Sequence, residues 1–317
     1  MSGFEFGALV SARAVVGSTL HDLGGLHDNV WGLTADVGAP IAAFASAFPD
    51  RYVDVGIAEQ NVVGIAAGLA LEGNLPFIAG MAPFMTMRAL EQNRTDVCYQ
   101  DLPVTFVGWG GGLVTGGGST HNAMEDIAIM KALVNMTVLS VGDPNMVGEL
   151  MRLSIDHPHP TYIRLGKGKG DPTLYDPATF DLAIGKGLVA RPGSDATIIA
   201  HGDMVWEALQ AAETLAGDGI EVRVVDMYSV QPLDVDLLFA AVDETGHIVV
   251  MEDHLARGGL ASSIADELID AGVSPRSFRR LGTPPVYVGF GSAQEQWRKY
   301  DYDRVAAVRT IQHMLRT

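Results

Sequence analysis

Short apolar runs of strand length alternate with segments of helical periodicity along almost the whole chain. In the first half, the strand-like runs lie at residues 30–34, 75–79, 103–108 and 137–141. The main helical segments there lie at residues 86–96, 123–133 and 145–156. Asp143 and Pro144 predict the cap and first turn of the last of these helices. Continuous apolar strands separated by helices are typical of parallel sheets covered on both faces, so the alternation predicts an α/β fold.

The alternation is interrupted between residues 166 and 184, where Lys-Gly repeats and two Asp-Pro pairs replace the periodic pattern. A segment of this composition predicts a linker. Beyond it the alternation resumes, with strand-like runs at 196–200, 221–226 and 247–251 and helical segments at 204–216 and 259–271. We therefore predict two doubly wound domains, a mainly parallel-sheet domain over residues 1–165 and a second α/β domain over residues 185–317.

The charge balance and the cysteine count limit the partners and the compartment. Lys and Arg total 21 against 38 Asp and Glu, which gives a formal charge of -17 and argues against a nucleic-acid partner. No apolar run reaches the roughly 18 residues of a membrane span, and the first residues lack the features of a signal peptide. We therefore expect a cytoplasmic protein with no membrane partner. Cys98 is the single cysteine, so an intrachain disulfide is impossible.

One carboxylate stands at an unusual junction. Glu59 follows a strand-like run at residues 51–55 and precedes a helix of small apolar residues at 62–71. A Glu in this place either interacts with the helix N-terminus or is held, partly desolvated, for proton transfer. In isolation the helix-capping interpretation is the simpler one.

Three further strings change that interpretation. They are Arg51 to Asn61 with Glu59 inside it, Ala82-Pro83-Phe84 followed by residues 88–92, and Ser119-Thr120-His121-Asn122 followed by Glu125-Asp126. Together they resemble the pyrimidine-binding domain of transketolase-like thiamine-diphosphate enzymes. The resemblance continues through Glu252-Asp253-His254 and residues 257–261, and it covers nearly the whole chain. It implies a pyrimidine-binding domain over residues 1–165 and a transketolase C-terminal-type domain over residues 185–317.

The resemblance assigns roles to four residues near the cofactor. Glu59 would hydrogen-bond a ring nitrogen of the aminopyrimidine of thiamine diphosphate and promote proton transfer there. Phe84 would stack on the pyrimidine, where the alternative is an ordinary core residue. Asp36 would lie near the cofactor edge, although a helix cap explains it equally well. His121 would lie near the substrate oxygens, and we predict Glu59 and His121 as the catalytic residues.

Further positions concern the substrate. Arg164 matches a family Arg that binds a substrate phosphate, with a salt bridge to the linker as the alternative, and Arg13 is a weaker match to another such position. Gly117 stands where the family usually has an Asp that binds a donor hydroxyl, and Trp109 stands where many members have a His. Losing a contact built for a hydroxyl changes specificity strongly, so we expect a non-standard substrate.

Other polar residues receive no catalytic role. In the second domain, His201, Asp253 and His254 are interpreted as structural or interface residues. His157 and His159 are each followed by Pro and have no third His or carboxylate close in sequence, so this tract predicts a turn and no metal site.

The family's diphosphate-binding domain is missing from the resemblance. Gly217-Asp218-Gly219 looks like the string with which the family binds magnesium and diphosphate, but the last Asn of the chain is Asn145, so the required later Asn is absent. The resemblance therefore implies the C-terminal subunit of a split transketolase, with Mg²⁺ ligated by an N-terminal diphosphate-binding subunit. It also implies a heterotetramer that contains a second copy of this chain.

The implied reaction is the transfer of a two-carbon ketol unit between a ketose-type donor and an aldehyde-type acceptor, both small sugar or keto molecules. Two alternatives remain open. One is a beta subunit of a 2-oxoacid dehydrogenase or a deoxyxylulose-phosphate-synthase-like decarboxylating enzyme, which shares the Glu. The other is a non-catalytic scaffold or regulatory subunit, which would require none of Glu59, Phe84 and His121.

Overall fold

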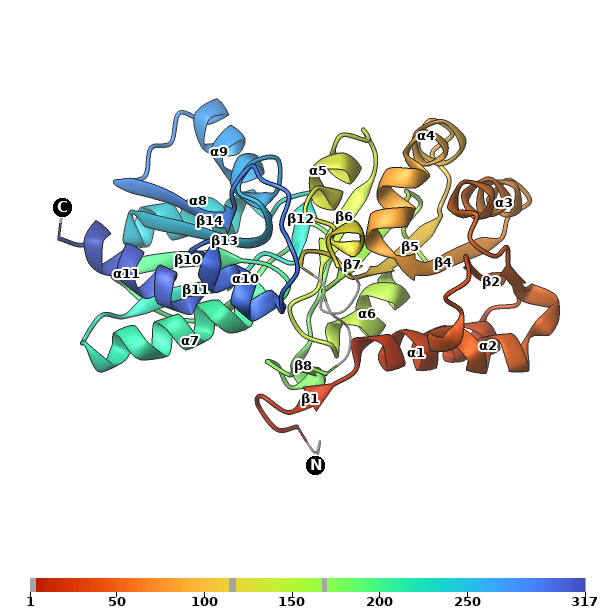
Figure 1. Cartoon of the computed structure of the whole chain (residues 1–317), viewed down its shortest axis with the longest axis horizontal. Coiled ribbons are helices and arrows are strands. Elements are labelled where there is room, and N and C mark those ends of the chain that lie inside the picture. Colours follow the sequence, from red (N-terminus) through yellow and green to blue (C-terminus); the bar gives the residue numbers. More distant parts are fainter. Residues whose placement is uncertain (1–3, 114–117, 167–169, 317) are drawn as a thin grey trace.

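The computed structural model of the protein describes residues 4–113, 118–166 and 170–316, so Gly117 lies outside the described residues. The chain forms two α/β domains that lie side by side, each on its own sheet (Figure 1). The predicted fold class is confirmed. Across the described ranges, no helix combines the length and the apolar character that crossing a membrane requires.

The first domain is built on a seven-stranded sheet in the order β12-β6-β7-β5-β4-β2-β3. Its strands are β2 (Val30–Thr34), β3 (Tyr52–Asp54), β4 (Leu75–Met81), β5 (Thr105–Trp109), β6 (Thr137–Ser140), β7 (Thr161–Leu165) and β12 (Ser229–Gln231). Neighbouring strands are parallel except β12 and β6, which are antiparallel. Because β12 follows the linker in sequence, the second half of the chain supplies an edge strand of the first sheet.

Helices cover both faces of this sheet, as continuous apolar strands require. One face carries α1 (Ala12–Leu26), α2 (Ala42–Ala47) and α6 (Met146–Leu153), and the other carries α3 (Glu59–Leu71), α4 (Leu90–Gln92) and α5 (Asp126–Lys131) (Figure 1). Successive strand residues therefore enter different cores. Ile78 and Phe106 belong to the cluster beneath α3, whereas Phe77 and Val107 belong to the cluster beneath α1.

The second domain has a five-stranded sheet in the order β14-β13-β10-β11-β9. Its strands are β9 (Leu188–Arg191), β10 (Ala196–Ala200), β11 (Val222–Asp226), β13 (His247–Leu255) and β14 (Ser277–Thr283). Helices α7 (Met204–Gly217), α10 (Ala293–Lys299) and α11 (Arg304–Met314) pack on one face, and α8 (Val235–Thr245) and α9 (Leu260–Asp270) on the other (Figure 1). The cluster beneath α3 continues into residues of α8 and α9, so the two domains share buried apolar contacts.

Short elements complete the fold. Strands β1 (Leu9–Val10) and β8 (Asp171–Pro172) pair antiparallel and join the start of the chain to the linker. The short helical turns are Ala39–Ile41, Pro49–Arg51, Phe84–Arg88, Asn93–Cys98, Ser119–His121 and Pro177–Thr179.

Two local predictions from the sequence are wrong. The helix predicted over 86–96 is interrupted, because π-helical turns at Phe84–Arg88 and Asn93–Cys98 flank the single α-turn of α4. Asp143 does not cap α6, whose N-cap is Asn145 without a side-chain hydrogen bond. The Asp143 carboxylate instead accepts hydrogen bonds from the backbone N–H groups of Leu174 and Tyr175 in the linker, and also from that of Asn145. Leu174 is buried, so its backbone N–H needs an acceptor, and Asp143 supplies one.

Candidate active site

A pocket of about 310 Å³ opens at the carboxyl ends of β2 and β4. From β2 the chain passes to β3 on one side and returns to β4 on the other side, so the strand order reverses here. Crevices at such reversal points are where open α/β sheets bind ligands. Four of the predicted site residues line this pocket: Asp36, Glu59, Phe84 and His121. The fold therefore brings together residues that lie up to 85 positions apart, from 36 to 121, in the sequence.

Glu59 is the first residue of α3 and only 4% exposed. The helix N-cap, Ala58, makes no side-chain hydrogen bond, and the Glu59 Oε2 atom lies 2.6 Å from Nη1 of Arg88. The carboxylate is thus held by a cation from the pocket wall rather than used as a cap. The apolar side chains of Val62 and Val63, both fully buried, pack the helix against the sheet and keep water away from the first turn.

Phe84 and His121 also line the pocket. Their rings meet edge to face, with centroids 5.1 Å apart and an interplanar angle of 77°. The guanidinium of Arg88 lies 4.5 Å from the centroid of the Phe84 ring, so Arg88 contacts both Phe84 and Glu59. His121 ends a short helical turn and its Nδ1 lies 3.0 Å from the hydroxyl of Thr120. A buried acid, a cation, an imidazole and an aromatic ring therefore line the same cavity, with a second acid, Asp36, beside them.

Arg88 has no role among the predictions from the sequence. A signal was present, because Arg88 follows Phe84 by four residues in a segment of helical periodicity, and residues at that spacing share a face. The π-helical turn at Phe84–Arg88 brings both side chains to the cavity. Irregular turns of this kind are frequent at functional sites.

Asp36 lies at the rim of the pocket, directly after β2. Its φ of 60° is in the left-handed region, which Asp tolerates better than most residues. Its backbone N–H donates to Oδ1 of Asp54, which also accepts from Gly56 N. The nearest helical turn, Ala39–Ile41, has Gly38 as its N-cap, so helix capping does not explain Asp36.

Trp109 and Arg13 are not brought to this pocket. Trp109 is 2% exposed and belongs to the apolar cluster beneath α1. Arg13 lies over it, with its guanidinium 5.1 Å from the ring centroid, and burial lowers the pKa of Arg13. Substrate binding by either residue stays a prediction, and Gly117 lies outside the described residues.

Arg164 lies between the domains rather than in the pocket. It is 2% exposed, and its Nε donates to Oδ2 of Asp126 over 2.7 Å, while Nη2 donates to the backbone oxygen of Asp253 over 2.8 Å. Burial alone would raise the pKa of Asp126, but Arg164 and the hydroxyl of Tyr162 hold that pKa below its usual value. The guanidinium thus pairs with α5 rather than with the linker, and phosphate binding by Arg164 stays an untested prediction.

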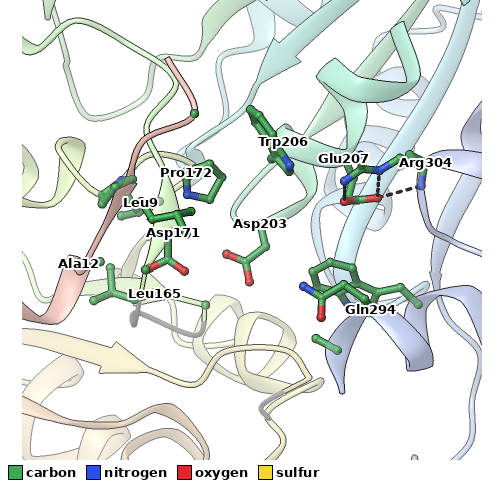
Figure 2. Close-up of a pocket in the computed structure, with 18 residues that line it drawn as sticks. Leu9, Ala12, Leu165, Asp171, Pro172, Asp203, Trp206, Glu207, Gln294 and Arg304 are labelled. Atoms are coloured by element: carbon green, nitrogen blue, oxygen red, sulfur yellow. Dashed lines mark hydrogen bonds and ion pairs between the residues drawn. The ribbon is translucent and has the colours of Figure 1, made fainter. Parts of the chain in front are cut away.

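A second cavity, of about 360 Å³, lies between the domains near β8 and α7 (Figure 2). Its labelled side chains include the carboxylates of Asp171 and Asp203 and the ring of Trp206. Glu207 and Arg304 pair with each other at one side of it. None of the predicted site residues lines this cavity, so the candidate active site is the pocket that contains Glu59.

Within the ranges described, no three His, Cys, Asp or Glu side chains gather as a metal site would require. Gly219 has a φ of 77° and forms the turn that follows α7. His157 and His159 stack edge to face, and His159 binds Asp101.

Comparison with known families matches both halves of the chain. Residues 9–172 match the family described as transketolase, pyrimidine binding domain. Residues 185–305 match the family described as transketolase, C-terminal domain. One subunit of the apulose-4-phosphate transketolase of Phocaeicola vulgatus is 33% identical over 305 residues, which cover 95% of this chain and 96% of that protein.

Two other similar proteins differ in length. The 1-deoxy-D-xylulose-5-phosphate synthase 1 of Geobacter metallireducens is 36% identical over 310 residues, which cover 96% of this chain but 49% of the synthase. The chain thus spans about half the length of the synthases that it matches. A solved structure described as a split gene transketolase, inactive beta4 tetramer, is 35% identical with a TM-score of 0.88, covering 96% of this chain and 98% of that one.

Proposed function

The chain belongs to the transketolase family, and on this premise we propose that it is one subunit of a split thiamine-diphosphate-dependent transketolase-like enzyme. The proposed reaction transfers a two-carbon ketol unit from a ketose-type donor to an aldehyde-type acceptor. The observation that carries the proposal is the buried Glu59 carboxylate in a pocket that also contains Phe84 and His121. A scaffold without activity would need none of these three residues.

The pocket residues fit the aminopyrimidine of the cofactor. A flat heteroaromatic ring needs an apolar slot, an aromatic partner and a polar group at its edge. The slot is formed by Val62, Ile78 and Met85, the aromatic partner is Phe84, and the polar group is the Glu59 carboxylate. Arg88 binds Oε2 of Glu59, so we assign Oε1 to the ring nitrogen of the pyrimidine.

Thiamine diphosphate, when bound, supplies a thiazolium ring that acts as an electron sink for cleaving a bond beside a carbonyl. Glu59 would share a proton with the pyrimidine nitrogen in a pocket where little water weakens the hydrogen bond. Arg88 keeps the carboxylate in place through its contact at 2.6 Å. His121 would donate a hydrogen bond to a substrate oxygen on which negative charge develops.

The diphosphate and Mg²⁺ are proposed to be bound by a separate N-terminal subunit. The sequence supports this, since no Asn follows Gly219. The similar protein from Phocaeicola vulgatus is itself named as a subunit, and the similar solved chain is described as the product of a split gene. The cytoplasmic compartment expected from the sequence is part of the same proposal.

A heterotetramer with a second copy of this chain is proposed as the active assembly. The outer face of α3 supports it, because Gly64 and Gly68 are exposed there and Leu71 is 59% exposed. Ile57, which lines the pocket, is 74% exposed. An apolar side chain at the open side of a cofactor pocket is suited to burial beneath another subunit.

We expect the complex of this chain with its diphosphate-binding subunit to transfer ketol units from ketose donors and to release no CO₂ from pyruvate. The substrate panel pairs ketose phosphates and unphosphorylated ketoses with aldehyde acceptors, and includes pyruvate with glyceraldehyde 3-phosphate. Because Trp109 and Gly117 replace the polar residues usual in the family, xylulose 5-phosphate with ribose 5-phosphate is expected to react slowly. Steady-state rates and CO₂ release are measured together.

The panel also separates the alternatives. Decarboxylation of pyruvate with formation of a deoxyketose phosphate would contradict ketol transfer and favour a synthase-like enzyme. The 36% identity to such a synthase is the observation that favours this alternative. Fast turnover of xylulose 5-phosphate with ribose 5-phosphate would contradict only the expectation of a non-standard substrate and would leave ketol transfer in place. A complex that binds cofactor but turns over none of the pairs would favour the scaffold.

A further inference from the structure

The segment that carries His121 begins and ends at one pair of residues. Gly112 N donates to the backbone oxygen of Ala123 over 2.7 Å, and Ala123 N donates to the backbone oxygen of Gly112 over 3.0 Å. These reciprocal bonds form a stem, which we define as Gly112 and Ala123. His121 lies two residues before Ala123 of the stem, and its ring contacts that of Phe84. The placement of His121 over the pocket therefore depends on where the stem is held.

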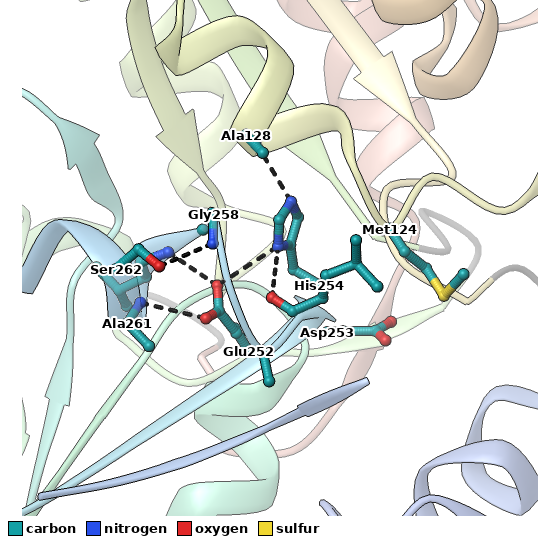
Figure 3. Close-up of polar contacts among 12 residues, drawn as sticks. Met124, Ala128, Glu252, Asp253, His254, Gly258, Ala261 and Ser262 are labelled. Carbon is teal, nitrogen blue, oxygen red and sulfur yellow. Dashed lines mark hydrogen bonds and ion pairs between the residues drawn. The ribbon is translucent and has the colours of Figure 1, made fainter. Parts of the chain in front are cut away.

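The second domain holds this stem through the end of β13. Asp253 accepts a hydrogen bond at Oδ2 from the backbone N–H of Leu113, the residue directly after Gly112, over 2.9 Å. Leu255 N donates to the backbone oxygen of Met124 over 2.9 Å, on the other side of the stem. Figure 3 shows Asp253 and Met124 on facing segments, with Glu252 and His254 beside them. Both sides of the stem are thus attached to one strand of the second domain.

Asp253 is itself fixed in place. It is 2% exposed, and its second oxygen, Oδ1, accepts from the hydroxyl of Tyr302 over 3.0 Å. Its backbone oxygen accepts from Nη2 of Arg164, which also approaches the backbone oxygen of Ala123 at 3.4 Å. His254, the next residue, accepts at Nε2 from Ala128 N in the first turn of α5 (Figure 3). A rigid carboxylate therefore fixes the N–H of Leu113.

Gly112 shows how close this contact is. Its φ of +85° is in the region that favours glycine, and a Cβ atom built on it would lie 2.1 Å from Oδ2 of Asp253. No side chain fits between the stem and the carboxylate. The stem and Asp253 are thus in direct contact, with no layer between the two domains.

We propose that Asp253, from the second domain, is a positioning residue for His121. Through Leu113 it sets the stem, and through the stem it sets the distance of the imidazole from the reacting substrate. This inference rests on the proposed function, because it assigns His121 a role in turnover. It gives the second domain a function in the reaction beyond covering the first.

The test compares substitutions on both sides of the contact in the reconstituted complex. Asp253→Ala removes the acceptor of Leu113 N–H, and Gly112→Ala displaces the same carboxylate from the stem side. Misplacement of a catalytic group by about 1 Å costs up to about 10²-fold, so kcat is expected to fall by about 10- to 100-fold while thiamine-diphosphate affinity is unchanged. Asp253→Asn, whose amide oxygen still accepts from Leu113, is expected to restore most of kcat. Tyr302→Phe removes one of the bonds that hold Asp253 but keeps the bond to Leu113, so its loss of kcat is expected to be smaller than that of Asp253→Ala.

Two readouts separate positioning from general damage. In a His121→Ala background, Asp253→Ala is expected to cost nothing further, because it acts only through the imidazole. In the ¹³C-histidine NMR spectrum of this chain, the His121 signal, identified by its loss in His121→Gln, is expected to shift in Asp253→Ala and to shift less in Tyr302→Phe. The inference would be overturned if the kcat losses of His121→Ala and Asp253→Ala multiply in the double variant. It would also be overturned if the His121 signal is unchanged in Asp253→Ala. If His121→Ala alone turns over like the wild type, the role of His121 in the proposed function fails, and the NMR spectrum still decides whether Asp253 positions His121.

Discussion

Replacing Glu59 by Gln is expected to lower turnover of the reconstituted complex by about 10²- to 10⁴-fold, the range typical of losing a positioned acid–base group. Gln keeps the shape of the side chain, and its amide oxygen can still accept a hydrogen bond from Arg88, which lies 2.6 Å from Oε2 in the native site. What it cannot do is exchange a proton with the pyrimidine nitrogen. The fold and the thermal unfolding temperature are expected to stay close to those of the wild type, and steady-state kinetics give the loss.

Glu91→Gln is the matched control, since Glu91 is an exposed residue of α4 that contacts Gln92 and Thr95. It changes the net charge of the chain to the same extent and is expected to leave kcat unaltered. A Glu59→Gln complex with the turnover of the wild type would show that this carboxylate does not activate the cofactor.

Replacing Arg164 by Met is expected to destabilise the protein by about 3–5 kcal/mol, because removal of one partner leaves a buried charge without its counter-ion. Asp126 is fully buried, and Arg164 is its cationic partner at 2.7 Å. The same substitution removes the donor to the backbone oxygen of Asp253, so the contact between the domains weakens as well. Urea unfolding, followed by circular dichroism, measures the change in the free energy of unfolding.

Arg152→Met supplies the comparison for Arg164. Arg152 pairs with Glu149 at 3.8 Å, and both side chains are about half exposed, at 50% and 41%. Such surface pairs contribute roughly 0–1 kcal/mol. Equal losses of unfolding free energy for the two Arg variants would mean that the buried pair stabilises the protein no more than the exposed one. The phosphate-binding role predicted from the sequence would then be the better explanation of Arg164.

The sequence predicts the fold well because the alternation of strands and helices is a local pattern. Strand β2 begins and ends where the pattern places it, at Val30 and Thr34, and α7 differs from the predicted helix by one residue at its C-terminal end. The interruption of the helix after Phe84 was not predictable in the same way. There the side-chain amide of Asn93 donates to the backbone oxygen of Met85, which is a tertiary contact that periodicity does not contain.

The candidate site was predicted in part. The residues placed around the cofactor do share one pocket, because they follow the ends of neighbouring strands. Arg88 was missed although its spacing of four residues from Phe84 was a signal, because its distance to Glu59 is visible only in the fold. Asp253 was interpreted as structural because the second domain does no chemistry in the family that the chain resembles, and the sequence does not reveal its partner, Leu113, which lies 140 residues away. Arg164 was predicted to bind phosphate from its place at a strand end, which stays untested. Its ion pair with Asp126 is visible only in the fold.

In the proposed assembly, this chain holds the pyrimidine half of a cofactor whose diphosphate is bound by another subunit. Calorimetric titration of thiamine diphosphate with Mg²⁺ tests it most directly, with this chain alone, the diphosphate-binding subunit alone, and the two mixed. We expect tight, magnesium-dependent binding only in the mixture, and loss of part of that affinity when the mixture contains Phe84→Ala. Tight magnesium-dependent binding by this chain alone would contradict the account.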